Sequence, residues 1–169
     1  MYIVKSRNRM NQVAAILLTL TFMLTTVSAQ QSSNSTKKVI VGGWIETVTF
    51  EGGVMPPLKS LVTFNADGTM TVADQGNVNL AAGQLFSAGH GAWSAQGDRT
   101  FNWTTLELIS DLSGNLIGTL KVRGTYTVDE SGDAYAGSFY AEVKDTSGTL
   151  LFAAGGTNAG VRIQVEPLL

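Results

Sequence analysis

The chain has 169 residues, contains no cysteine and carries a formal net charge of −2. The lack of cysteine excludes disulfides and thiolate metal sites, and the low charge density argues against nucleic acid or an anionic membrane surface as a partner. A single histidine excludes a metal site built from several histidines. We therefore expect no metal and no cofactor, and a fold held together by its core alone.

The first 29 residues have the pattern of a secretory signal peptide. Three basic residues within the first nine precede an apolar run over 13–27, and small residues at 27–29 suit a signal peptidase. A membrane anchor is the alternative reading, but four threonines interrupt the apolar run. We therefore predict cleavage after Ala29 and a secreted or periplasmic protein. Cleavage would remove three of the 11 basic residues and none of the 13 acidic ones, giving 8 − 13 = −5.

After the leader, the sequence predicts a tether and one domain. Residues 30–38 are polar and have nothing apolar to bury, which predicts a disordered tether. From residue 39 onward, apolar/polar alternation is broken by turns rich in Asp and Gly, the pattern of antiparallel strands. The strands are expected over 39–50, 58–65, 69–73, 89–95, 99–109, 115–128, 134–144, 149–154 and 159–166.

Residues 74–88 interrupt this alternation. We predict a long loop there, with or without a short helical turn. The loop carries Leu80, Leu85 and Phe86, which need apolar surface to cover. It is therefore expected to act as a lid over one end of the domain.

The pattern as a whole predicts an all-β fold. Strands of about ten residues without covering helices are typical of a single antiparallel up-and-down β-barrel, here with eight or nine strands over 39–169. An outer-membrane barrel is the alternative, but the aromatic residues are few, the turns are short and the C-terminus lacks a final aromatic residue. We expect no stable membrane insertion, and a monomer or weak dimer.

The alternation also assigns the faces of the strands. Leu120, Val122 and Tyr126 share one face of their strand, whereas Lys121 and Arg123 lie on the other. In water the apolar face must line the barrel, as a filled core or around one small ligand. The aromatic residues expected either to line a ligand cavity or to fill the core are Trp44, Trp93, Trp103, Tyr126 and Phe139.

Two carboxylates fall on faces that are otherwise apolar. Glu46 alternates with Trp44, and Glu107 alternates with Trp103. A buried carboxylate is costly unless it is paired, so each is a candidate catalytic acid with a raised pKa, or the partner of a buried base. That base would be Arg162, Arg99 or Lys59. The alternatives are a bulge that turns the carboxylate outward, or a structural ion pair.

His90 is the remaining candidate for acid–base chemistry. At the barrel mouth it would face Glu46 or Glu107. The alternative is a surface histidine near a turn, because Trp93 is expected to point inward and places His90 on the opposite face.

The segment Gly42-Gly43-Trp44 resembles the Gly-x-Trp motif that opens the first strand of lipocalins and the wider calycin barrels. The resemblance implies that Trp44 closes one barrel end and packs under an arginine from a late strand, here Arg162. Two features depart from the calycin pattern: a second Gly-x-Trp at 91–93 and the absence of a helix after the last expected strand.

The strand-rich, helix-free and exported architecture also resembles allene oxide cyclase-type barrels. That resemblance implies cyclisation in an apolar cavity with very few polar residues. We therefore expect an exported β-barrel that binds a small apolar or amphipathic molecule. The alternatives are an isomerase or cyclase of the allene oxide cyclase type, and a filled structural or surface-interaction barrel without a ligand.

Overall fold

The computed structural model describes residues 39–168. Its elements are β1 (Gly42–Phe50), the 3₁₀ helix η1 (Glu51–Gly53), β2 (Leu58–Phe64), β3 (Thr69–Asp74), β4 (Val78–Asn79), β5 (Gln84–Phe86), β6 (Gly89–Ala95), β7 (Thr100–Asp111), β8 (Leu116–Val128), β9 (Ala134–Asp145) and β10 (Leu150–Arg162). The expected signal peptide and tether lie outside the described residues. Within 39–168, no helix has the length and apolar character needed to cross a membrane.

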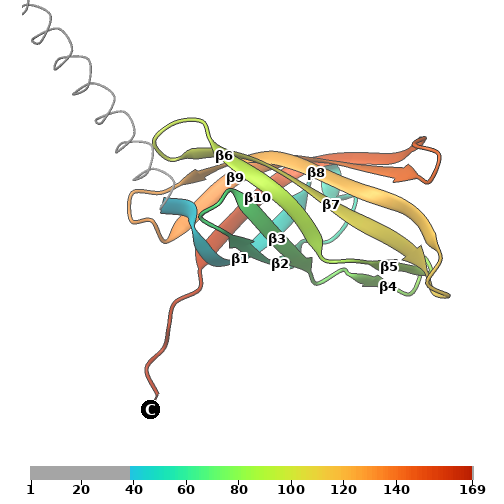
Figure 1. Ribbon diagram of the computed structural model, residues 1–169, viewed down its shortest axis with the longest axis horizontal. Coiled ribbons are helices and arrows are strands. Elements are labelled where there is room, and N and C mark those ends of the chain that lie inside the picture. Colours follow the sequence, from blue (N-terminus) through green and yellow to red (C-terminus); the bar gives the residue numbers. More distant parts are fainter. Residues whose placement is uncertain (1–38, 169) are drawn as a thin grey trace, which may run out of the picture. The chain divides into compact units, whose positions relative to one another are not determined.

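Eight of the strands close into one antiparallel up-and-down barrel (Figure 1). The order around the barrel is β1, β2, β3, β6, β7, β8, β9 and β10, and β10 pairs back onto β1. The predicted all-β barrel is thus confirmed, with eight strands in its wall. The other two strands form a hairpin, in which β5 pairs with the end of β7 beyond the part that pairs with β6.

The faces follow the alternation in the sequence. On β1, Trp44, Glu46 and Val48 are buried between more exposed neighbours. On β7 the buried residues are the odd-numbered ones from Phe101 to Ile109. Each strand therefore has one side in the barrel and one side toward solvent, as a period of two requires.

Three of the turns share the sequence Asp-x-Ser-Gly. They begin at Asp111, Asp129 and Asp145, and in each the aspartate Oδ1 accepts backbone N–H groups from later residues of the turn. Side-chain hydrogen bonds from Asn115, Ser131 and Ser147, together with these backbone bonds, hold the pKa of each carboxyl below its ordinary value. The glycine that ends each turn has φ between 81° and 87°, a region that other residues rarely adopt. These turns fix the register of the long strands.

The segment 74–88 differs from its prediction. It contains the short hairpin β4–β5 rather than an irregular loop or a helical turn. Leu80 is 71% exposed, whereas Phe86 contacts the interior space described below. The expected lid is therefore an extension of the barrel wall, and of its three apolar residues only Phe86 faces that space.

The C-terminal part also differs from its prediction. The two expected strands, 149–154 and 159–166, are one continuous strand, β10, which ends at Arg162. The turn expected over 155–158 is absent, and glycines of this strand make room for aromatic rings. A Cβ at Gly160 would lie 2.3 Å from the Tyr135 ring, and one at Gly156 would lie 2.5 Å from the Phe139 ring. Each glycine is the cross-strand partner of that aromatic residue and leaves room for it.

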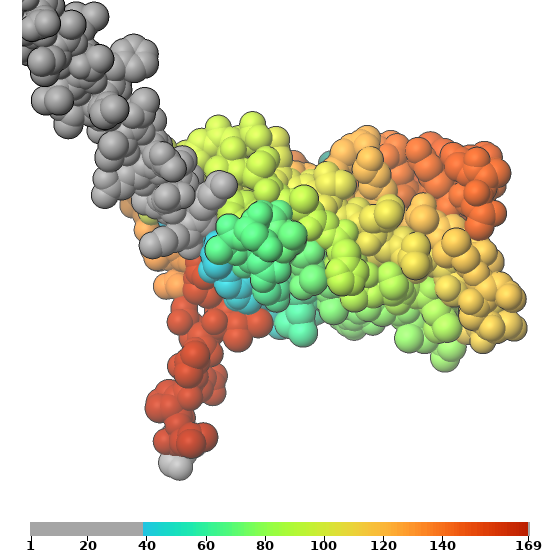
Figure 2. Space-filling model, viewed as in Figure 1, coloured from blue at the N-terminus to red at the C-terminus, as the bar shows by residue number. Residues whose placement is uncertain are grey.

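The chain both enters and leaves the barrel next to Trp44, which contacts Ile40 before β1 and pairs with Arg162 at the end of β10. Val39 and Ile40 are helical rather than extended, and Ile40 is fully buried at this end. After Arg162, Ile163 and Gln164 still donate hydrogen bonds to Gly43 and Asp133, and the chain up to residue 168 then projects from the barrel (Figure 2). The predicted strand 39–50 therefore begins three residues late, and the one predicted to end at 166 ends four residues early.

The interior divides into two halves along the barrel axis. The aromatic half is filled by packed rings: Trp44, Phe64, Trp93, Phe101 and Tyr135. Tyr126 stands at the boundary, with its ring stacked on Trp103 at 5.0 Å between centroids. The other half, toward η1, the β4–β5 hairpin and the β9–β10 turn, contains a cavity, and we refer to it as the cavity half.

Candidate functional site

The cavity has a volume of about 390 Å³, which is within the range of small-molecule pockets. Its apolar lining comes from both sides of the barrel: Val48, Phe50, Met55, Leu58, Val72, Phe86, Leu120, Val122, Phe139, Ala141, Val143, Leu151 and Phe152. Met55, Leu151 and Phe152 are also exposed to solvent, so the cavity reaches the surface between them. An apolar entrance of this kind suits an apolar or amphipathic ligand.

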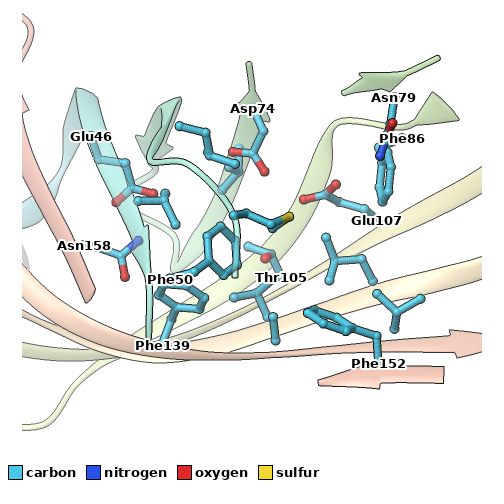
Figure 3. A pocket seen from close by; sticks show the side chains of 18 of the residues that line it. Glu46, Phe50, Asp74, Asn79, Phe86, Thr105, Glu107, Phe139, Phe152 and Asn158 are labelled. Atoms are coloured by element: carbon cyan, nitrogen blue, oxygen red, sulfur yellow. The ribbon is translucent and has the colours of Figure 1, made fainter. Parts of the chain in front are cut away.

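Three acidic side chains face this cavity from neighbouring strands. Glu46 on β1, Asp74 on β3 and Glu107 on β7 all line it, and Figure 3 shows their carboxylates around the same space. In the strand register Glu46 pairs with Ser60, and Ser60 pairs with Asp74, so these three residues form one row across β1, β2 and β3. The hydroxyl of Ser60 donates a hydrogen bond to Asp74 Oδ1.

Glu46 is held at the boundary between the two halves. It is 3% exposed, and its Oε2 accepts hydrogen bonds from the hydroxyls of Tyr135 at 2.8 Å and Tyr126 at 3.1 Å. Burial raises the pKa of Glu46 to about 7, and Asp74 adds to the rise, whereas the two tyrosines and Asn158 oppose it. Burial and the Glu46 charge in turn raise the pKa of both tyrosines, which keeps their hydroxyls protonated as donors.

Glu107 on β7 is the second buried glutamate of the cavity. It is also 3% exposed, and no side chain of residues 39–168 donates a hydrogen bond to it. Burial raises the pKa of Glu107 to about 8, with a further contribution from the negative charge of Asp74. The glycine beside it makes space for the carboxylate, because a Cβ at Gly89 would lie 3.2 Å from Glu107 Oε1.

Asp74 lies close enough to raise the pKa of both glutamates. Its own pKa is raised by burial, and the hydrogen bond from Ser60 partly opposes this rise. The three carboxyls therefore compete: ionisation of one makes ionisation of the next less favourable. Glu46 and Glu107, with pKa values raised to about 7 and about 8, are potential proton donors or acceptors near neutral pH.

The expected basic partners are elsewhere. Lys59 is exposed and donates to Thr47, and Arg99 donates to the backbone oxygens of Asp129 and Glu130. The ion pairs among residues 39–168 are Arg123–Glu142 and Arg162–Asp133, neither of which includes Glu46 or Glu107. The alternatives of a bulge and of a structural ion pair are therefore wrong for both glutamates.

Two polar atoms in the cavity lining are buried without a partner. Trp103 is 6% exposed and Asn158 is 4% exposed. Within the described part of the chain, neither Trp103 Nε1 nor Asn158 Oδ1 has a hydrogen-bond partner. Buried polar groups are normally paired, so one free donor and one free acceptor beside a cavity indicate groups available to a ligand.

His90 does not belong to this site. It is exposed on the outer face of β6, between inward-facing Gly89 and Gly91. The prediction that it faces Glu46 or Glu107 is wrong, because Trp93 points inward and the pleat then turns His90 outward. The alternative reading of a surface histidine agrees with the structure.

The aromatic candidates divide between the two halves. Trp103, Tyr126 and Phe139 line the cavity, whereas Trp44 and Trp93 do not. Trp93 Nε1 donates to the backbone oxygens of Asn65 and Thr69, both at 3.0 Å. Trp44 and Trp93 therefore fill the core, and the interpretation of these two as ligand-binding residues is corrected.

Trp44 and Arg162 lie together at the filled end. The guanidinium carbon of Arg162 lies 4.2 Å from the centroid of the Trp44 ring. Arg162 also donates to the backbone oxygens of Gly132, Val41 and Val39, and Trp44 Nε1 donates to Ile40 O at 2.8 Å. This geometry matches the barrel-end closure that the sequence motif implies.

Sequence reasoning missed three residues of the site. Asp74 was placed at the start of a loop, although Met70, Val72 and Asp74 continue one alternating face. Asn158 falls between the strands expected over 149–154 and 159–166, where Gly155 and Gly156 resemble a turn. Tyr135 is buried on β9, but no local pattern in the sequence predicts its contact with Glu46, 89 positions away. Within the described range, no group of three or more His, Asp or Glu side chains is arranged to hold a metal ion.

Comparisons with known proteins support the fold. No family model and no curated protein matches the chain. Among solved structures, that of EF1p2_mFAP2b bound to DFHBI is 19% identical and covers 78% of this chain and 99% of its own, with a TM-score of 0.52. Two redesigned β-barrels also match: b11L5F_LGL is 18% identical (78% and 96% covered, TM-score 0.43). The second, mFAP1 bound to DFHBI, is 17% identical (76% and 99% covered, TM-score 0.42). The match to EF1p2_mFAP2b shows a shared barrel fold.

Proposed function

We propose that this protein is an exported β-barrel that binds one small amphipathic molecule in its cavity half. The observation that carries the proposal is the cavity of about 390 Å³, which combines an apolar lining with buried polar atoms that lack partners. The solved barrel of similar fold, EF1p2_mFAP2b, is bound to DFHBI, which supports a ligand-binding barrel. A filled structural barrel would have no such space.

The proposed export rests on the leader pattern of residues 1–29, and the protein would be secreted or periplasmic as a monomer or weak dimer. Intact-mass measurement of the protein recovered outside the cytoplasm tests the export. The expected mass is that of a chain beginning at Gln30, and a protein that retains its leader in the membrane fraction would contradict the proposed export.

Binding is tested with the neutral fluorescent probe N-phenyl-1-naphthylamine. The expected result is saturable binding of about one probe per chain. In Val122→Trp, a large side chain fills the cavity, and binding should be lost. Lys121→Trp, on the outer face of the same strand, is the matched control and should bind as the unmodified protein does. Equal binding by both variants would contradict the proposal.

A second candidate is an isomerase or cyclase of the allene oxide cyclase type. The specific observation in its favour is that Glu46 and Glu107, with pKa values raised to about 7 and about 8, border an apolar cavity. Such carboxyls can exchange a proton with a bound substrate near neutral pH. The test is conversion of an allene oxide above its spontaneous rate, with loss of that excess in Glu46→Gln and Glu107→Gln. No excess over the spontaneous rate would contradict it.

A further inference from the structure

The cavity has one acidic wall and one apolar wall. Glu46, Asp74 and Glu107 project from β1, β3 and β7, and Figure 3 shows them on one side of the space, with Phe139 and Phe152 on the other. The apolar wall comes from β8, β9 and β10, through residues such as Leu120 and Val143. A ligand that fills this space therefore meets carboxyls on one side and hydrocarbon on the other.

No positive charge balances the acidic wall. The residues that line the cavity include three acidic side chains and no Lys, Arg or His. The basic side chains on the strands around it, among them Lys59, Lys121 and Arg123, are exposed on the outer face. A buried carboxylate without a cation is unfavourable, so a positively charged group entering the cavity supplies what the wall lacks.

The buried acceptors beside the acidic wall also favour a cationic head group. Asn158 Oδ1 is a buried acceptor without a partner in the described chain, and it lines the cavity close to Glu46. No described side chain donates to Glu107, whose oxygens are further acceptors. An ammonium group has three donors and no acceptor, and it can satisfy several such oxygens at once.

We infer that the cavity selects amphipathic molecules with a protonated amine head, held by Glu46, Asp74, Glu107 and Asn158, and an apolar tail against β8, β9 and β10. This inference rests on the proposed binding function and specifies its ligand class. An anionic head would meet three acidic groups, and a neutral head would leave their charge unbalanced. The amine head is the group that both satisfies the acceptors and neutralises the wall.

The protonation of the site supports this inference. The titratable groups that face Glu46 are Tyr126, Tyr135 and Asp74, and Asp74 also faces Glu107. With pKa values raised to about 7 and about 8, the two glutamates hold protons in part at neutral pH. A bound ammonium group favours their ionised form, so amine binding should release protons, whereas binding of a neutral molecule should not.

The test uses three molecules that differ only in the head group: 4-phenylbutylamine, 4-phenylbutanol and 4-phenylbutanoate. Titration calorimetry at pH 8 should show the amine binding at least about tenfold more tightly than the alcohol, with the carboxylate weakest. In buffers of different ionisation enthalpy, the amine alone should release protons. Its affinity should rise from about pH 6 to about pH 9 as the glutamates ionise.

A matched pair of variants locates the effect. Glu107→Gln should weaken amine binding about tenfold and change alcohol binding by less than about threefold. Glu130→Gln, an exposed glutamate in the turn after β8, makes the same change in net charge and should alter neither. If Glu107→Gln does not fold, Asp74→Asn provides the same comparison.

The outcomes separate this inference from the proposed function. Equal affinity for amine and alcohol, or amine binding that Glu107→Gln leaves intact, would overturn the inference while ligand binding stands. Failure of all three molecules and of the naphthylamine probe would overturn the proposed function as well.

Discussion

The aromatic half and the cavity half of the barrel are built from the same strands but differ in whether their buried polar groups are hydrogen-bonded. In the aromatic half, the indole N–H groups of Trp44 and Trp93 are both hydrogen-bonded to backbone oxygens. In the cavity half, Trp103 Nε1 and Asn158 Oδ1 have no partner in the described chain, and Glu107 is buried without a donor. The difference agrees with the proposal that the aromatic half stabilises the fold, whereas the unpaired groups of the cavity half bind a ligand.

Tyr126 and Tyr135 connect the two halves. Their rings pack against each other and against the aromatic half, with 4.3 Å between the ring centroids. Their hydroxyls hold Glu46 at the edge of the cavity. The aromatic half therefore fixes the orientation of the Glu46 carboxyl, which borders the cavity half.

The largest expected effect is a difference between the two halves in how much a truncated side chain lowers the free energy of unfolding. Trp44→Ala should lower the free energy of unfolding by about 3 to 5 kcal/mol, because it empties a packed site at the filled end. Leu120→Ala should lower it by less than about 2 kcal/mol, because Leu120 already borders empty space. Chemical denaturation measures both. Equal losses in the free energy of unfolding would mean that the two halves stabilise the fold to the same extent.

The second effect concerns pH. The pKa of Glu107 is raised from 4.5 to about 8 in the folded protein, so the folded state holds a proton that the unfolded state releases in this window. Stability from this proton is present below pH 4.5 and is lost as the pH rises through about 8. Glu107→Gln removes the loss and should be more stable than the unmodified protein at alkaline pH, on the order of a few kcal/mol. The free energy of unfolding of both proteins is measured by denaturation from acid to alkaline pH. A difference between them that stays constant over this range would contradict the burial of an uncompensated carboxyl.

A smaller effect concerns the space that glycine leaves for the rings. Gly160→Ala places a methyl group against Tyr135 and should lower the free energy of unfolding by about 1 to 3 kcal/mol. Gly97→Ala, where a Cβ would meet nothing within 4 Å, is the control and should change it by less than about 0.5 kcal/mol. Thermal melts compare them. A tolerated alanine at 160 would show that the glycine–aromatic pairs are loosely packed.

The smallest effect is the coupling between Trp44 and Arg162. The guanidinium over the indole should give an interaction energy of about 0.5 to 2 kcal/mol. A double-mutant cycle of Trp44→Phe and Arg162→Ala measures it. Strictly additive losses would mean that the stacking does not stabilise the filled end.

The sequence predicted the faces of the strands better than positions along the barrel axis. Alternation on β1 and β7 placed Glu46 and Glu107 inside, because a period of two is a local property. Whether an inward residue lies in the aromatic half or the cavity half depends on the stagger of strands far apart in the chain. For this reason Trp44 and Trp103 looked equivalent in the sequence, although only Trp103 lines the cavity.

The missed residues show a second limit. Glycines at 155–156 resemble a turn, and only the packing of the Phe139 ring against Gly156 explains why they lie within a strand. Asn158 was lost from the predicted site for this reason. Asp74 is missing from the predicted site because the strand expected over 69–73 ends one residue before it. Both errors arise from contacts between distant strands, which override local turn signals.

The most direct test of the central claim follows the three tryptophans of the chain in one experiment. In a ¹H–¹⁵N spectrum, the indole signals of Trp44, Trp93 and Trp103 report the filled end and the cavity separately. On titration with 4-phenylbutylamine, the Trp103 signal should move to saturation while those of Trp44 and Trp93 stay in place. Movement of the Trp44 and Trp93 signals alone, or no movement of the Trp103 signal at all, would contradict the cavity half as the ligand site.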